Sequence, residues 1–114
     1  MYNFCDIFWA DLPNLPESSV QQGHRPVVIV SNNRGNSSSH TVNVIPITSK
    51  LKKTRIPTHV NIIGFGLQRE SIVLAEQTMT LDKRCLTKKI GTIDDERLIK
   101  KIQEALMIQF NIVA

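Results

Sequence analysis

Apolar residues recur in short runs separated by turn-forming residues, a pattern that predicts a small β-rich fold. Phe4, Phe8, Ala10 and Leu12 occupy alternate positions with Asp6 between them, which predicts a first strand over about residues 5–12. A continuous branched run predicts a buried strand at 26–31. The remaining runs predict strands at 41–48, 58–62, 71–76, 78–81 and 88–93.

Polar segments divide these strands. Residues 13–23 and 32–39 contain proline, glycine, asparagine and serine and are predicted to be loops, and residues 50–54 form a basic loop. Pro46 lies inside the strand predicted at 41–48 and lacks a backbone donor. We therefore expect Pro46 at a sheet edge or a bulge.

The periodicity changes near the C-terminus, where apolar residues recur at steps of three and four from Leu98 to Phe110. This spacing predicts a helix, and its apolar stripe is either core or a dimer interface. Asp94, Asp95 and Glu96 fall in its first turn, where the helix dipole favours negative charge. Many short strands followed by one helix indicate a small barrel-like sheet with a C-terminal helix.

The 114 residues are expected to form one domain, 1–114, with a thin core that oligomerisation would reinforce. The formal net charge of +4 suits an anionic partner. Cys5 and Cys85 fit neither a disulfide framework nor a zinc site, so a reduced, cytoplasmic compartment is the simplest interpretation. The N-terminus does not resemble a signal peptide, and no run approaches the roughly 18 apolar residues of a membrane span.

A candidate anion site lies at two predicted strand ends. Gly23 and Pro26 mark a junction between loop and strand, with Arg25 at the mouth of the strand. Thr48 and Ser49 end another strand. A guanidinium and two hydroxyls on adjacent strand ends could bind a phosphate group. Neither Arg25 nor Thr48 is expected in the core.

The same residues carry a family resemblance that covers nearly the whole chain. The chain resembles the MazF-type toxins of bacterial toxin–antitoxin pairs, the group that includes PemK and Kid. The matching segments, in order, are residues 6–12 (DIFWADL), 22–28 (QGHRPVV), 46–49 (PITS), 57–60 (PTHV), 76–77 (EQ) and 81–86 (LDKRCL). The resemblance implies the SH3-like barrel of the MazF and CcdB toxins.

The resemblance also implies a function. Such toxins are sequence-specific, metal-independent endoribonucleases that cleave single-stranded RNA, chiefly mRNA, and arrest growth. No cofactor is expected. A homodimer is implied, together with a cognate MazE-like antitoxin carrying an acidic disordered segment.

The expected chemistry needs no metal site, and His24, His40 and His59 have no metal-ligand spacing. In RNA the ribose 2′-hydroxyl can attack the adjacent phosphate, so the protein needs only to orient the strand, stabilise charge and move protons. Arg25 is the expected charge stabiliser. The family implies an acid/base role for this arginine, but a guanidinium hardly ever loses its proton. Thr48 would bind the scissile phosphate or orient the 2′-hydroxyl.

Further residues are expected to bind RNA. Gly23 and Ser49 flank the catalytic pair, Lys52, Lys53 and Arg55 form a basic loop, and Glu76 and Gln77 end a strand where they could contact base edges. His59 could shuttle a proton. Each also has a purely structural interpretation: a solvated charge run, an ordinary strand end or a half-buried histidine.

Two other functions remain open from the sequence. A CcdB-like protein would poison DNA gyrase and cleave nothing, and a non-catalytic barrel would bind RNA only. Fold does not separate these from the nuclease. The pairing of Arg25 with Thr48 favours the nuclease.

Overall fold

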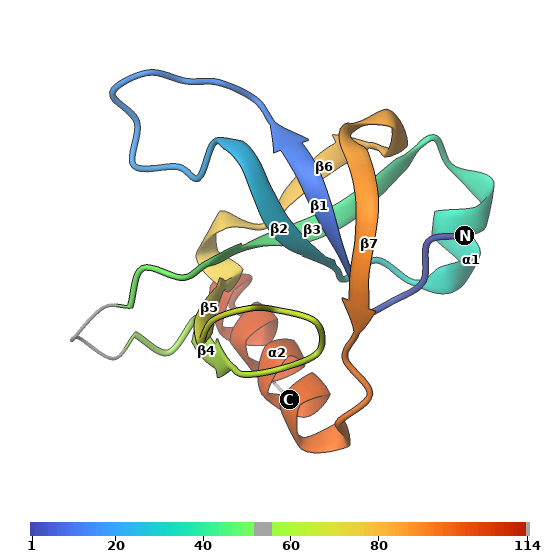
Figure 1. The fold of residues 1–114 in the computed structure, drawn as a ribbon. Coiled ribbons are helices and arrows are strands. Elements are labelled where there is room, and N and C mark those ends of the chain that lie inside the picture. Colours follow the sequence, from blue (N-terminus) through green and yellow to red (C-terminus); the bar gives the residue numbers. More distant parts are fainter. Residues whose placement is uncertain (52–55, 114) are drawn as a thin grey trace.

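The computed structural model describes residues 1–51 and 56–113 (Figure 1). Within them the sheet comprises β1 (Asp6–Leu12), β2 (Gly23–Ile29), β3 (Thr41–Thr48), β4 (His59–Ile62), β5 (Ser71–Leu74), β6 (Met79–Asp82) and β7 (Leu86–Thr92). The helices are α1 (Asn33–Ser38), α2 (Glu96–Gln109) and two 3₁₀ helices, η1 (Ala75–Gln77) and η2 (Lys83–Cys85).

All strand pairs are antiparallel, and their order is β4-β5-β3-β2-β1-β7, with β6 also paired to β3. Strand β3 therefore pairs with three other strands, β2, β5 and β6. Figure 1 shows the sheet curling, with α2 lying beside β4. The predicted fold, a small β barrel of the MazF toxin type with a C-terminal helix, is confirmed.

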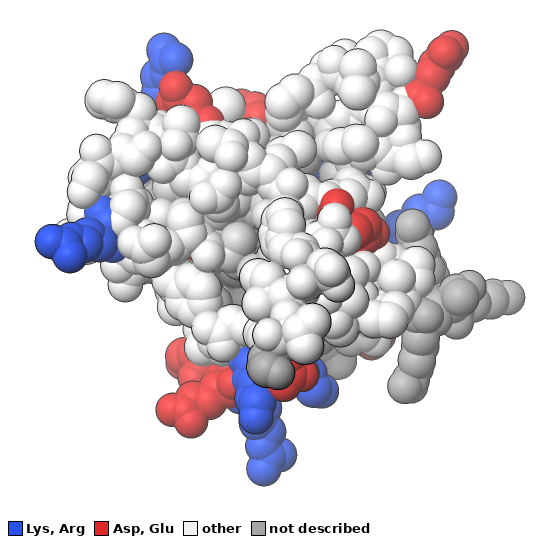
Figure 2. Space-filling model, turned by 180° about the vertical axis from the view of Figure 1, so that it is seen from behind, with Lys and Arg blue, Asp and Glu red and all other residues white. Residues whose placement is uncertain are grey.

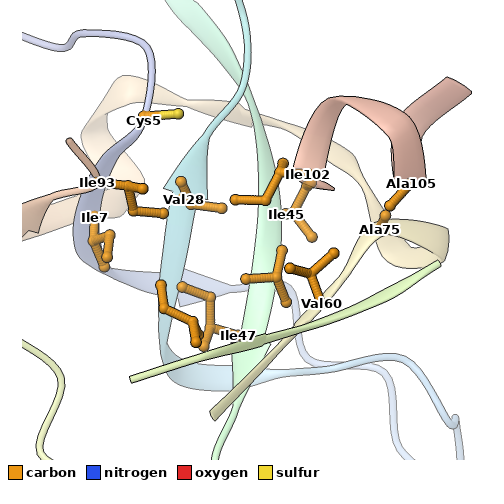
Figure 3. Close-up of a cluster of buried hydrophobic side chains, with 12 residues drawn as sticks. Cys5, Ile7, Val28, Ile45, Ile47, Val60, Ala75, Ile93, Ile102 and Ala105 are labelled. Carbon is orange, nitrogen blue, oxygen red and sulfur yellow. The ribbon is translucent and has the colours of Figure 1, made fainter. Parts of the chain in front are cut away.

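The core has two parts because successive strand residues point to opposite faces. One cluster packs Ile7, Val28, Ile45 and Ile47 against Ile102 and its neighbours on α2 (Figure 3). The second contains Phe8, Ala10, Val27, Ile29, Val42, Val44 and Leu81. The branched run of β2 thus contributes to both clusters, as its continuous apolar pattern predicted.

Pro46 is neither at an edge nor at a bulge in its pairing with β2, contrary to expectation. It lies opposite Val27 in the central strand β3. On the other side of β3, pairing with β6 covers Thr41–Val44 and pairing with β5 covers Ile47–Thr48. Proline is tolerated there because its missing N–H falls where β3 changes partner.

Two segments predicted as loop or strand contain short helices. The segment 32–39, expected as a loop, contains α1, whose N-cap Asn32 accepts a hydrogen bond from the Gly35 backbone N–H at 2.7 Å. The strand expected to run to Glu76 ends at Leu74, and Glu76 lies in η1. Both helices are short and lack an apolar period, so the hydrophobic pattern does not reveal them.

Helix α2 begins at Glu96, so of the three acidic residues expected in its first turn only Glu96 lies there, and Asp95 is the N-cap. The Asp95 carboxylate caps it, accepting hydrogen bonds from the backbone N–H groups of Arg97 at 2.9 Å and Leu98 at 3.3 Å. The apolar stripe of α2 is buried in the middle of the helix and exposed at its C-terminal end. Ile102 and Ala105 are buried, whereas Phe110, just past the last turn, is 57% exposed.

An uncharged surface surrounds that end of α2. A groove of about 470 Å³ is lined by residues just after β2, in β3, in and before β6, in α2 and in the segment after α2: Val30, Asn43, Thr78, Met79, Thr80, Leu106, Met107, Phe110 and Ile112. Figure 2 shows the molecule from behind, with a largely uncharged centre and most charged side chains toward the rim. No helix in the described residues is long and apolar enough to cross a membrane.

Candidate active site

Arg25 lies within β2, opposite Ala10 of β1, rather than at the mouth of the strand as expected. The strand starts at Gly23, whose φ of +78° lies in the left-handed region that favours glycine. This turn brings the Gln22 carbonyl to 3.1 Å from Arg25 Nε, which donates to it. The guanidinium is exposed and has no other hydrogen bond among the described residues. Its outer nitrogens are therefore available to a ligand.

Thr48 ends β3 beside the same strand. The register of β2 and β3 places Val27 opposite Pro46. The pairing of the two strands ends at these residues, and Arg25 and Thr48 each lie two residues beyond it. Contrary to expectation, Thr48 belongs to the interior, since it is only 5% exposed. Its hydroxyl oxygen accepts from the Lys50 backbone N–H at 3.1 Å.

A pocket of about 310 Å³ opens beside these strand ends. Its lining residues come from β1, β2, β3 and the residue after it, the loop before β5, β5 and β7: Trp9, His24, Arg25, Pro26, Ile47, Ser49, Gly66, Leu67, Gln68, Arg69, Ser71 and Ile90. The pocket brings Arg25 and Ser49 together and adds a second guanidinium, Arg69. Thr48 does not line it. Two cations in one pocket favour an anionic ligand.

One wall of this pocket depends on close backbone packing. A Cβ at Gly91 of β7 would lie 2.1 Å from the Phe65 carbonyl oxygen, and one at Gly66 would lie 2.4 Å from the Ile90 carbonyl oxygen. No side chain fits at either position. The two glycines let the loop around Gly66 lie directly on β7, which holds Leu67, Gln68 and Arg69 at the pocket.

His59 and Glu76 form a separate polar cluster. His59 Nε2 lies 2.7 Å from Glu76 Oε2, and the Thr58 hydroxyl donates to Glu76 Oε1 at 3.1 Å. Burial works against ionisation of this carboxyl, but the hydrogen bonds from His59, the backbone and Thr58 outweigh it and lower the pKa of Glu76. The carboxylate is thus held ionised and oriented.

The imidazole of His59 is almost fully buried, and its Nδ1 has no hydrogen-bond partner in the described part of the chain. Gln77, next to Glu76, accepts from the Gln21 backbone N–H at 2.7 Å and so ties η1 to the loop between β1 and β2. Lys52, Lys53 and Arg55 lie outside the described residues. Neither His59, Glu76 nor Gln77 lines the pocket that contains Arg25.

The sequence did not point to Trp9, His24 or Gln68 as site residues. Trp9 and His24 come together only through the register of β1 and β2, and Gln68 and Arg69 only through the packing at Gly66 and Gly91. No group of three or more His, Cys, Asp or Glu side chains in residues 1–51 and 56–113 is arranged to hold a metal ion.

Residues 3–110 match a family model described as the PemK-like, MazF-like toxin of type II toxin–antitoxin systems. The chain belongs to this toxin family. Among curated relatives of this PemK/MazF-family chain, Endoribonuclease EndoA of Bacillus subtilis (strain 168) is 41% identical over 110 residues, which cover 95% of this chain and 93% of the relative. The expected class, a toxin endoribonuclease of the MazF type, is confirmed.

Solved structures agree on the fold of this MazF-family chain. A mycobacterial endoribonuclease in complex with its cognate antitoxin aligns with 100% of this chain and 99% of its own, with a TM-score of 0.82 and 24% identity. Mycobacterium tuberculosis toxin MazF-mt6 aligns over 96% and 99%, with a TM-score of 0.79 and 24% identity. The family match favours the nuclease over the CcdB-like gyrase poison, which the fold alone does not do.

Proposed function

We propose that this chain is a single toxin domain, 1–114, that cleaves single-stranded RNA, chiefly mRNA, at a short recognition sequence without a metal ion. The proposal rests chiefly on Arg25. Its guanidinium is exposed, Arg25 and Ser49 line one pocket, and the chain is 41% identical to an endoribonuclease. Because mRNA is cytoplasmic and both Cys5 and Cys85 are free thiols, we assign the protein to the cytoplasm.

The proposed reaction uses a nucleophile that RNA itself supplies. The ribose 2′-oxygen attacks the adjacent phosphorus while its proton leaves, and the bond from phosphorus to the 5′-oxygen breaks as that oxygen gains a proton. The products are a 2′,3′-cyclic phosphate and a 5′-hydroxyl. Arg25 would stabilise the charge that develops on the equatorial oxygens, because its fork of N–H donors matches two of them.

Thr48 and Ser49 have distinct proposed roles. The Thr48 oxygen already accepts from Lys50 N, and its hydroxyl proton remains free to donate toward a phosphate or a 2′-oxygen. Ser49 is exposed in the pocket and would bind the phosphate backbone, with Gly23 permitting close approach of the chain. The basic residues Lys52, Lys53 and Arg55 would add affinity for phosphates.

Glu76 and Gln77 are the proposed base-reading residues. A carboxylate fixed by His59 and Thr58 is a strong acceptor for the amino group of a cytosine or an adenine. His59 is proposed to orient Glu76. Its buried side chain and its contact with the carboxylate make this role fit better than proton shuttling.

The proposed assembly is a homodimer that is inhibited by a MazE-like antitoxin. The uncharged groove at the end of α2 and the exposed Phe110 and Ile112 support an apolar contact between two copies. An acidic disordered antitoxin segment would match the cations at the RNA site and would gain order on binding.

The decisive experiment is incubation of the purified protein with a long RNA in excess EDTA. We expect cuts at a small set of sites that share a short motif, with duplex RNA and DNA left intact. The new 5′ ends are expected to accept label directly from polynucleotide kinase. A strict need for added Mg²⁺ or Mn²⁺, or 5′ ends that require phosphatase first, would contradict the mechanism.

A further inference from the structure

Two aromatic rings form a parallel stack on the surface beside Arg25. The centroids of Trp9 and His24 are 5.0 Å apart and their planes differ by 7°. They meet because the pairing of β1 with β2 sets Trp9 opposite Pro26 and Asp11 opposite His24, so the two rings are diagonal neighbours on one face.

The imidazole is fixed on a second side. His24 Nδ1 lies 2.9 Å from Asp11 Oδ1, so its orientation is set by an edge contact as well as by the indole. Even so, 53% of the His24 side chain is exposed. Because Trp9 covers one face of the ring and Asp11 holds one edge, the exposed surface includes the opposite face.

This arrangement contributes little to stability. An ion pair or hydrogen bond as exposed as that between Asp11 and His24 is typically weak. The contacts of His24 with Trp9 and Asp11 instead fix the orientation of the imidazole, which presents a flat ring at the surface. The ring precedes Arg25 in the chain, and both residues line the pocket that also contains Ser49 and Arg69.

We propose that His24, held between Trp9 and Asp11, is a stacking platform for one nucleobase of the RNA, next to the phosphate bound by Arg25. An aromatic face binds any base, because every base has a π-surface, so the platform adds affinity and fixes the strand without selecting a sequence. The inference rests on the proposed ribonuclease function and adds a binding residue to it. It predicts a role for the ring face of His24, not for its proton.

The test compares His24→Ala with His24→Phe, which keeps a flat ring but has no titratable nitrogen. The cleavage site is first mapped with the unaltered protein, and affinity is then measured with an oligonucleotide of that sequence made uncleavable by a 2′-O-methyl group. We expect His24→Ala to weaken binding and raise KM roughly 5- to 100-fold, the usual range for loss of one stacked base. In His24→Phe both quantities are expected to return to within about 3-fold, with an unchanged pH profile of kcat.

A matched control and a second readout make the result specific. His40→Ala removes another exposed histidine, away from the pocket, and is expected to leave binding unchanged. Trp9 is the only tryptophan in the sequence, so its fluorescence reports directly on the stack. RNA with an abasic residue at one position should bind the unaltered protein as weakly as intact RNA binds His24→Ala, and should lose nothing more in that variant.

The outcomes separate this inference from the function on which it rests. Normal binding by His24→Ala, or a His24→Phe variant as impaired as His24→Ala, would overturn the stacking role while the unaltered protein still cleaves RNA. An unaltered protein that neither binds nor cleaves RNA would overturn both. The thermal unfolding midpoint of each variant verifies that it is folded.

Discussion

His59 Nε2 lies 2.7 Å from Glu76 Oε2 at the junction of β4 and η1. This contact, with that of Thr58, keeps the pKa of Glu76 below its ordinary value of 4.5. A carboxyl whose pKa is lower in the folded state stabilises the fold above pH 4.5, and this contribution disappears as the pH falls through the lower folded value.

The first prediction follows from the lowered pKa of Glu76 in the folded protein. Glu76→Gln is expected to lower the free energy of unfolding near neutral pH and to make it less dependent on pH on the acid side of 4.5. Urea unfolding from pH 7 to pH 3 measures both. Glu70→Gln, which alters an exposed glutamate, is the matched control. If the free energy of unfolding changed with pH in the same way for Glu76→Gln and the unaltered protein below pH 4.5, the contact would add no stability.

Arg25 is predicted to dominate catalysis. Arg25→Ala should lower the cleavage rate by roughly two orders of magnitude or more, as expected for loss of a preorganised charge stabiliser. Arg25→Lys should restore little, because an ammonium cannot make the bidentate contact. Since Arg25 is exposed, the circular dichroism spectrum should not change. A full cleavage rate in a folded Arg25→Ala variant would remove Arg25 from the site.

Thr48 needs a different substitution because it is buried. Thr48→Val keeps the shape but removes the hydroxyl, so cleavage should fall, and the lost bond to Lys50 N should cost about 1 kcal/mol of stability. Thr48→Ser keeps the hydroxyl and should retain most activity. Single-turnover cleavage and urea unfolding, measured on the same samples, separate the two effects. If Thr48→Val cleaved at the unaltered rate, its hydroxyl would have no part in the reaction.

Dimerisation is predicted to depend on the end of α2. Phe110→Asp should dissociate the dimer, because it introduces a charge at an exposed apolar position of the groove. Sedimentation equilibrium at micromolar concentration should give twice the 12.9 kDa chain mass for the unaltered protein and a single chain mass for the variant. Ile63→Asp changes an apolar residue that is 70% exposed but lies away from the groove, and should remain dimeric.

The antitoxin is predicted to compete with RNA. An acidic segment that occupies the cationic site should displace a labelled, uncleavable RNA at stoichiometric concentration, which fluorescence anisotropy detects. The peptide would be taken from the gene adjoining this one. A stable ternary complex with unchanged RNA affinity would place the inhibitory contact elsewhere.

The strands and the long helix could be predicted from the sequence because their signals are local. The branched run of β2, the strand Thr41–Thr48 and the apolar period of α2 all depend on residues close in the chain. Arg25 and Thr48 could be chosen as candidate catalytic residues from their sequence neighbours alone, because both lie near strand ends. The order of the matching motifs carried the family resemblance, which implied the barrel fold and the ribonuclease function.

The sheet register and the packing of distant loops were decided by the tertiary structure. Pro46 is accommodated in a central strand only because β3 changes partner there, and Trp9 stacks on His24 only because β1 and β2 pair in one register. Arg69 joins Arg25 through the backbone contact at Gly66. Such contacts depend on residues far apart in the chain, and a one-residue shift of register would turn each strand side chain to the other face.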